Sequence, residues 1–265
     1  MAGARLLQSL DGRAFLDLDV WEFSLHSLWR PYGRLFFRSV LLRHPWRALA
    51  GLRTYRRRIR PGRRPGYSPI GEVSPEALEA ELASSEWVLG VGFCEKPLDP
   101  PCPSGRFNHR CWLLAQPDAD TPPAACQRCR IREVAMHALP AGATVHVMTS
   151  AVDFAHDVLL PGLRSGCVRP VVLSICPFSV PPITLALTIC GFRGLALSYT
   201  PGVCQDFVAW VRADEGFKPE QTGPSLETHH RLLALLDRVA ALRSGKGSTG
   251  PRRFRERGNF YVPVA

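Results

Sequence analysis

The chain has 265 residues and a formal net charge of +10; 46% of its residues are hydrophobic and 21% are charged. These values fit one globular domain with a core, together with an extension. Nine cysteines are an odd number in a chain of this length, which argues against a small disulfide-linked secreted domain. No apolar stretch long enough for a signal sequence precedes Asp11 and Arg13, so we expect a reducing, cytoplasmic setting.

The excess positive charge lies in the first quarter of the chain. Residues 1–66 contain 14 arginines, no lysine and 4 acidic residues. Aromatic residues such as Trp29 and Phe36 mix with arginines at a spacing that favours an amphipathic helix. We therefore predict a basic helical extension that docks on an anionic membrane surface or a protein partner, or that remains a solvated helix and linker. Nucleic acid is a less favoured partner because no nucleic-acid-binding motif accompanies the charge.

Residues 67–216 form the predicted folded domain, after a linker at residues 63–69. Ser74, Pro75 and Glu76 combine a hydroxyl cap, a proline and a first-turn acid, which predicts a helix through residue 85. Helical spacers then separate apolar runs that read as strands, at residues 87–93, 144–148, 170–175 and 194–199. This alternation predicts an α/β fold with a small, mainly parallel sheet and flanking helices.

Residues 171–192 carry no charge and are long enough to be considered as a membrane span. Pro177, Pro181 and Pro182 divide the segment, and its two parts fit a strand, a turn and a helix. Parallel strands that are buried on both faces are almost continuously apolar. We therefore predict that the segment belongs to the α/β core, and we expect no transmembrane segment.

A cysteine-rich insert follows the first predicted strand. Its four cysteines lie among many prolines, which prevent much regular structure, so a metal would supply the missing order. These cysteines are Cys102, Cys111, Cys126 and Cys129. Cys126 and Cys129 can reach one ion or cluster from a single turn, and the other two complete a four-sulfur set for an iron–sulfur cluster or for zinc. His109 is an alternative nitrogen ligand, although a loop histidine is the simpler interpretation.

Three further cysteines follow predicted strands. They are Cys94, Cys176 and Cys204. Ligands of open α/β sheets bind beyond the carboxyl ends of the strands, so we expect the three thiols at one sheet edge, where they complete the metal site or form another. Thr149, Ser150 and Asp153 follow the remaining strand and could position a ligand, but helix capping explains Ser150 and Asp153 more simply.

Two other cysteines, Cys167 and Cys190, precede strands, on the opposite edge of the sheet. We interpret both as structural and Cys190 as part of the core. Residues 217–265 are predicted to form a helix, capped by Ser225, and a flexible tail.

A metal-free use of Cys126 and Cys129 is the main alternative. They directly precede a predicted helix at residues 131–136, and a helix N-terminus near Arg128 and Arg130 lowers a thiol pKa. The pair would then act as a dithiol oxidoreductase. However, the segment before it, residues 121–125, is not the strand that a thioredoxin-like arrangement requires.

The cysteine layout resembles the bacterial and archaeal cysteine-rich domain of unknown function numbered 116. The resemblance spans about residues 87–213 and rests on Cys102-Pro103, on Cys126-x-x-Cys129-Arg130-Ile131, on Arg169-Pro170 before Cys176, and on Gly202-Val203-Cys204 before Asp206 and Trp210. It implies metal or iron–sulfur binding without a settled activity, with Cys102, Cys126, Cys129, Cys176 and Cys204 as the matching positions and Cys94 as a further one. The chain departs from the family at Gln127-Arg128, where a glycine is common, and at Cys176-Pro177.

The sequence therefore predicts a cytoplasmic metal-binding protein whose reaction is unresolved. The expected cofactor is an iron–sulfur cluster held by Cys102, Cys126, Cys129 and either Cys111 or Cys94, and the expected role is redox chemistry or assistance to an iron–sulfur enzyme. In the first alternative, zinc stabilises a scaffold that docks through its arginine-rich arm, at a membrane surface or on a protein. In the second, the thiols act without metal.

Overall fold

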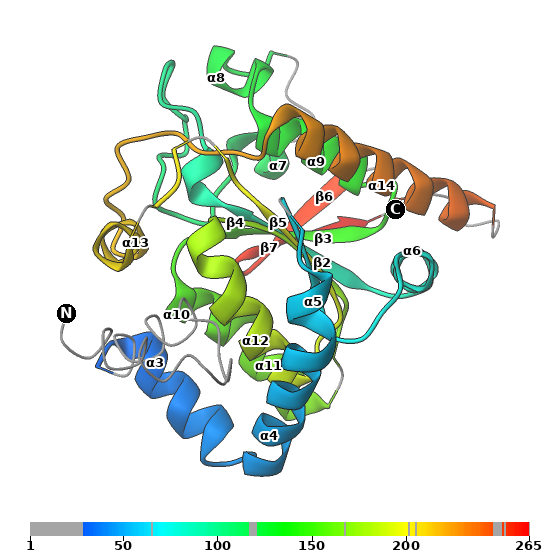
Figure 1. Cartoon of the computed structure of the whole chain (residues 1–265). Coiled ribbons are helices and arrows are strands. Elements are labelled where there is room, and N and C mark those ends of the chain that lie inside the picture. The colour runs from blue at the N-terminus through cyan, green and yellow to red at the C-terminus, as the bar shows by residue number, and fades with distance from the viewer. Residues whose placement is uncertain are drawn as a thin grey trace.

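The computed structural model describes residues 29–64, 66–116, 121–166, 168–200, 202–204, 206–245, 251 and 253–264. A seven-stranded sheet with the order β1-β5-β4-β2-β3-β7-β6 forms its centre (Figure 1). The strands are β1 (Tyr67–Ile70), β2 (Trp87–Gly92), β3 (Ala143–Met148), β4 (Val171–Ile175), β5 (Gly194–Ser198), β6 (Arg253–Arg257) and β7 (Phe260–Val264).

The four central strands β5, β4, β2 and β3 are parallel. In register, Val91 of β2 pairs with Val147 of β3 on one side and with Ser174 of β4 on the other. The antiparallel strands β1, β7 and β6 complete the two edges. All residues of β2 and β4 are buried, as expected for strands that are covered on both faces. The predicted α/β fold with a mainly parallel core is therefore confirmed.

Helices cover both faces of the sheet. One face carries α6 (Pro75–Ser84), α7 (Trp112–Ala115), α9 (Arg130–Ala138) and α14 (Leu226–Ser244). The other carries α10 (Ala151–Phe154), η5 (Ala155–Leu159), α11 (Leu160–Ser165) and α12 (Val180–Cys190). Shorter elements at the carboxyl end of the sheet are η4 (Phe93–Glu95), α8 (Ala124–Gln127), η6 (Pro177–Ser179) and α13 (Phe207–Asp214).

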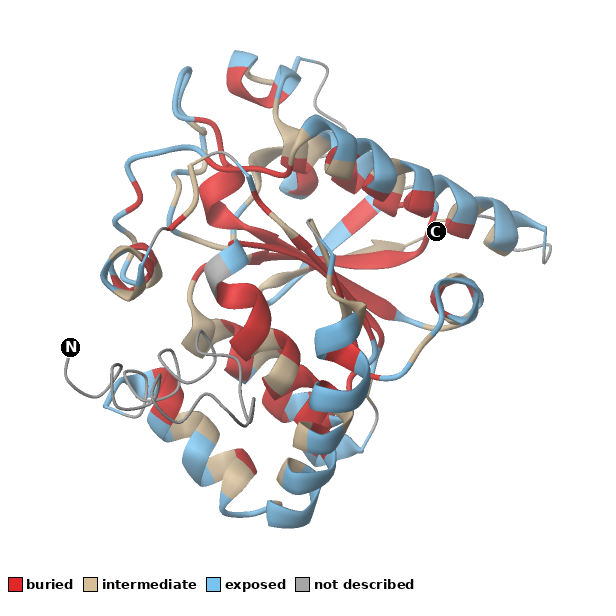
Figure 2. Cartoon of the chain, in the orientation of Figure 1, coloured by how far each residue is buried: buried red, intermediate tan, exposed pale blue. Residues whose placement is uncertain are grey.

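Strand residues that point to opposite faces of the sheet belong to two separate hydrophobic cores. Leu89 and Val91 pack under α6, α9 and α14, whereas Val88 and Leu173 pack under α11 and α12. Figure 2 shows the buried residues concentrated in the strands and in α12, with exposed outer faces on α4 and α14. The segment at residues 171–192 forms β4, η6 and α12, so its predicted place in the core is confirmed.

The two predicted serine caps are present. Ser74 Oγ accepts a hydrogen bond of 3.2 Å from the amide of Ala77, and Ser225 Oγ accepts one of 3.1 Å from the amide of Thr228. Each bond satisfies an amide that a helix start leaves without a partner in the helix.

The described part of the N-terminal extension packs on the domain and is not a detached arm. It consists of α3 (Pro31–Phe36), η2 (Phe37–Leu41), α4 (Pro45–Thr54), η3 (Tyr55–Ile59) and α5 (Arg60–Gly62). Gly51 allows α4 to approach α12 closely, because a Cβ at that position would lie 2.6 Å from the Cα of Ile189. Val40, Tyr55 and Ile59 are buried.

The interpretation of residues 63–69 as a linker is wrong in part, since Tyr67–Ile70 form β1. This strand pairs with β5 and covers an edge that would otherwise expose unpaired backbone groups.

The expected flexible tail is also wrong for Arg253–Val264, which form the β6–β7 hairpin. Phe254 of β6 and Tyr261 of β7 are buried in the core that α6, α9 and α14 cover, and β7 pairs with β3. The sequence did not predict β6 because most of its residues are charged and it contains no apolar run. Among the described residues, no helix has the length and apolar character needed to cross a membrane.

Candidate metal centre and sheet-edge pocket

The four cysteines of the insert, which we call the insert cysteines, come from three short segments. Cys102 lies in the loop after η4, Cys111 precedes α7, Cys126 lies in α8 and Cys129 precedes α9. Their charges interact: burial raises the pKa of Cys126, and the ionised forms of Cys129 and Cys102 raise it further. Burial likewise raises the pKa of Cys111 to about 11, again with a contribution from Cys129. The structure therefore brings these thiols into one neighbourhood.

Lys96 organises the loop that carries Cys102 and Cys111. Its side chain is buried, and Nζ donates hydrogen bonds to the backbone carbonyls of Gly105, Asn108 and Arg110 at 3.0, 2.8 and 2.7 Å. A fourth contact of 2.9 Å reaches Asn108 Oδ1. Much of the order that the sequence would assign to a metal thus comes from a buried ammonium and the carbonyl oxygens around it.

The charge of Lys96 has no carboxylate partner among the described residues. Burial lowers the pKa of Lys96 to about 8, and the ionised thiols of Cys102, Cys111 and Cys129 act in the opposite direction. An ammonium removed from water requires a compensating charge or good hydrogen bonds. The four oxygen contacts satisfy this ammonium, and Cys102, Cys111 and Cys129 would add negative charge next to it once a bound metal ionises their thiols.

The predicted redox use of Cys126 and Cys129 draws no support from their surroundings. Burial raises the pKa of both thiols, and this effect outweighs the hydrogen bonds that Cys129 receives from the backbone at the start of α9. A reactive dithiol requires the opposite shift in at least one sulfur.

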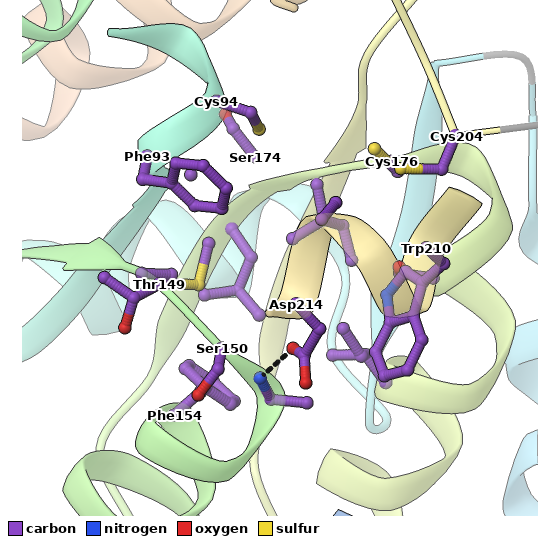
Figure 3. A pocket seen from close by; sticks show the side chains of 18 of the residues that line it. Phe93, Cys94, Thr149, Ser150, Phe154, Ser174, Cys176, Cys204, Trp210 and Asp214 are labelled. Atoms are coloured by element: carbon purple, nitrogen blue, oxygen red, sulfur yellow. Dashed lines mark hydrogen bonds between the residues drawn. The ribbon is translucent and has the colours of Figure 1, made fainter. Parts of the chain in front are cut away.

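Cys94, Cys176 and Cys204, which we call the edge cysteines, meet at the carboxyl ends of β2, β4 and β5. All three are buried and line a cavity of about 110 Å³, the edge pocket (Figure 3). The prediction that the strand ends bring them to one edge is confirmed. Parallel strands end at the same side of a sheet, so sequence order was sufficient to predict this meeting.

Cys176 and Cys204 form a hydrogen-bonded pair of thiols. The pKa of Cys204 is lowered, first by the Cys176 thiol that donates to it and then by nearby Lys218, against the effect of burial. The pKa of Cys176 is raised by the same hydrogen bond and by burial. Negative charge in this pair therefore resides on Cys204.

A buried carboxyl group lies beside the pocket. Tyr199 Oη accepts a bond of 2.9 Å from the Gly92 amide, and it lies 2.6 Å from the Ser174 carbonyl and 2.7 Å from Glu95 Oε1. One phenol proton cannot serve two acceptors. A protonated Glu95 resolves the conflict by donating to Tyr199, which then donates to Ser174. Burial accordingly raises the pKa of Glu95 to about 7.

The hydroxyls after β3 have local roles. Ser150 Oγ caps α10 by accepting from the Asp153 amide at 3.1 Å, as expected. Thr149 Oγ1 donates to Asp153 Oδ2 at 2.5 Å and lies 3.2 Å from His109 Nε2. His109 Nδ1 lies 2.8 Å from the carbonyl of Val147, so this nitrogen carries a proton. His109 therefore joins the loop of the insert to β3.

A second group of possible ligands was not found from the sequence. In the part of the chain that the structure describes, His109, His146 and Asp157 form the one set of three such residues whose ligand atoms lie within 4.8 Å of one another. Hydrogen bonds already join them to protein: His146 Nε2 lies 3.0 Å from Asp157 Oδ2, and Asn259 donates to the same oxygen. Burial lowers the pKa of His146, which favours a neutral ring within this network.

Cys190 lies in α12 and is buried, as predicted, and burial raises its pKa to about 12. Cys167 lies outside the described residues. The chain matches no protein-family model, no curated protein and no solved structure. The resemblance to the cysteine-rich domain numbered 116 therefore stays a prediction.

Proposed function

We propose that the protein binds an iron–sulfur cluster through the insert cysteines, Cys102, Cys111, Cys126 and Cys129. The observation that carries the proposal is the buried Lys96 ammonium, which has no carboxylate partner among the described residues and lies close enough to Cys102, Cys111 and Cys129 to interact with their ionised forms. A four-thiolate metal centre has a net negative charge, and Lys96 offsets it. Binding would in turn keep Lys96 protonated and hold the loop closed around its carbonyl contacts.

The spacing of the sulfurs favours a cluster over zinc. Tetrahedral zinc with bonds of about 2.3 Å holds its sulfurs roughly 4 Å apart. No three of the four insert sulfurs, all within the described residues, lie within 4.8 Å of one another. A cluster tolerates wider separations because different irons bind different cysteines.

The proposed role of the cluster is redox, either in electron transfer or as an accessory to an iron–sulfur enzyme. When bound, such a cluster supplies one-electron chemistry, and its potential depends on local charge and hydrogen bonds. Lys96 and the backbone at the start of α9 are the groups of this chain that would tune it.

Anaerobic purification followed by visible spectroscopy and analysis of iron, sulfide and zinc tests the proposal. We expect a broad band near ~400 nm with matched iron and sulfide. Cys126→Ala should lose most of the iron, whereas Cys190→Ala, which replaces a buried cysteine of α12, should retain it. A colourless protein with about one zinc, or a metal-free protein, would contradict the assignment of a cluster.

The exposed surface of the N-terminal arm favours a second role, at an anionic membrane. Trp29, Leu42 and Trp46 are 79%, 62% and 81% exposed. The same N-terminal helices and the short segment between them also carry exposed arginines, at Arg38, Arg43, Arg47, Arg53, Arg56 and Arg57. Apolar and aromatic side chains that enter the headgroup region, next to cations that bind anionic lipid, suit a peripheral membrane surface. The proposed setting is thus the cytoplasm, at a membrane surface.

Vesicle co-sedimentation tests this role. The full chain should bind vesicles that contain phosphatidylserine and not purely zwitterionic ones. Leu42→Ala should weaken binding about tenfold, because the apolar area that enters the membrane decreases. Leu242→Ala, which replaces an exposed leucine of α14 on the other side of the sheet, is the control. Equal binding to both kinds of vesicle would rule out the role of the arginines.

A further inference from the structure

The edge pocket contains features that a metal centre in the insert does not use. Five large, mainly apolar side chains line it, from α3, α10, α12, α13 and the short helix η4: Tyr32, Phe154, Leu187, Trp210 and Phe93. Its volume of about 110 Å³ is somewhat smaller than an apolar cavity of about 150 Å³ that accepts benzene. The pocket therefore suits an apolar group of only a few heavy atoms.

The pocket reaches the surface along one rim. Met148, Ser150 and Ile183 line it and are only half-buried. Cys176 directly follows β4, and Cys204 lies in the segment after β5. Both are buried, and Figure 3 shows their side chains next to each other. A small molecule that enters from the rim therefore meets two thiols that already contact each other.

We propose that the edge pocket is a second reactive site, in which Cys204 attacks a small apolar disulfide and Cys176 completes its reduction. Both side chains line the pocket next to each other, and the Cys176 thiol favours the ionised form of Cys204, which makes Cys204 the attacking sulfur. Helix α12 follows Cys176 directly through η6, and α13 follows Cys204, so packed elements hold both sulfurs.

Taken together, the groups around Cys204 favour its thiolate form. Lys218, which is buried, favours the ionised form, while Glu220 and Asp206 oppose it and the Cys176 thiol donates to it. Cys94, Tyr199 and Asp214 also line the pocket. Burial raises the pKa of Cys94 to about 11, so it stays a neutral thiol, and burial likewise raises the pKa of Tyr199 and of Asp214. The thiolate form is the nucleophile in disulfide exchange.

The reaction balances as two exchange steps. The Cys204 thiolate attacks one sulfur of R–S–S–R, the S–S bond breaks, and one RS⁻ leaves with the electron pair and takes a proton from water. Cys176 then loses its proton to water and attacks the Cys204 sulfur of the mixed disulfide, which releases the second RS⁻. The products are two thiols and a Cys176–Cys204 disulfide; an external dithiol is needed to restore the reduced pair.

Dimethyl disulfide, with four heavy atoms, is a suitable probe for the anaerobically purified full chain at pH 7. Peptide mass spectrometry after acid quenching and alkylation should find a Cys176–Cys204 disulfide in the native chain. In Cys176→Ser the reaction should end at the mixed disulfide between Cys204 and methanethiol. Cys204→Ser should form neither product, and Cys190→Ala, which replaces a buried cysteine of α12 that does not line the pocket, should behave like the native chain. Oxidised glutathione, a large and charged disulfide, should react at least tenfold more slowly.

A pair of substitutions tests the role of the hydrogen bond. Cys176→Ser keeps a hydroxyl donor, while Cys176→Ala removes it, so Cys204 in the alanine variant should react at least tenfold more slowly at pH 7 and approach the serine variant at pH 9. Two results would overturn the proposal: a native chain in which Cys176 and Cys204 remain reduced, or an equal rate for both variants across this pH range. Both readouts are independent of metal content, so they do not depend on the proposed cluster.

Discussion

The insert cysteines and the edge cysteines lie at the same end of the molecule but are held differently. Loops and the starts of short helices carry the insert cysteines, around the buried ammonium of Lys96. The ends of packed parallel strands precede the edge cysteines, which line an apolar pocket. Among the described residues, no three insert sulfurs lie within 4.8 Å of one another, whereas the side chains of Cys176 and Cys204 lie next to each other.

The difference shows that the chemistry open to a group of thiols depends on the structural elements that hold them. Space between the insert thiols can hold a metal centre, and the Lys96 ammonium beside them offsets the negative charge of that centre. Thiols that rigid elements hold in contact react most readily with each other, through a disulfide. One group should therefore depend on a ligand for its order, while the other should keep its arrangement without one.

The largest expected effect comes from removal of the Lys96 ammonium, on which the insert depends and the edge pocket does not. Lys96→Met leaves the carbonyl oxygens of Gly105, Asn108 and Arg110 without their donor, and we expect the free energy of unfolding to fall by on the order of 3 kcal/mol. Lys218→Met, at a lysine whose partner Glu220 is exposed, should cost less. Chemical denaturation measures both. Equal losses would mean that Lys96 has no special role in the insert.

Protonation of Glu95 should give a smaller effect on the free energy of unfolding. Its folded pKa of about 7 lies above the ordinary carboxyl value of 4.5, so its stabilising contribution is complete below pH 4.5 and is lost as pH rises through 7. The free energy of unfolding should fall by on the order of 2 kcal/mol between pH 5 and pH 8. Glu95→Gln should flatten this slope, and Glu227→Gln, at an exposed carboxylate, should not. A native slope of the opposite sign would refute the neutral Glu95.

The weakest expected effect concerns the C-terminal hairpin. Tyr261 Oη accepts a hydrogen bond of 2.7 Å from the amide of Cys111, which ties β7 to the insert. Tyr261→Phe should lower the free energy of unfolding by about 1 kcal/mol and speed amide exchange at Cys111. Unchanged exchange at that amide in the variant would show that the hairpin does not steady the insert.

The central strands and the meeting of the edge cysteines could be predicted because both depend on local pattern and on one topological rule. Apolar runs mark β2 to β5, and the carboxyl ends of parallel strands gather Cys94, Cys176 and Cys204. Spacing alone connected Cys126 with Cys129. The neighbourhood of Cys102 and Cys111 depends on the loop folding around Lys96, which no local pattern indicates.

Other features of the site escaped prediction because they join distant segments. Glu95 and Tyr199 are separated by 104 positions in the chain, and Tyr261 and Cys111 by 150. His146 lies inside a strand and resembles an ordinary core residue until η5 supplies Asp157. The hairpin escaped because its outer strand is mostly charged, although Gly258 and Asn259 suit the turn between its strands.

Metal analysis of two double variants, each purified without oxygen, tests the division of roles most directly. Cys102→Ser/Cys129→Ser should contain almost no iron or sulfide, while Cys176→Ser/Cys204→Ser should match the iron, the sulfide and the visible spectrum of the native chain. Iron lost only from the edge variant would place the metal at the sheet edge and contradict the assignment of the cluster to the insert.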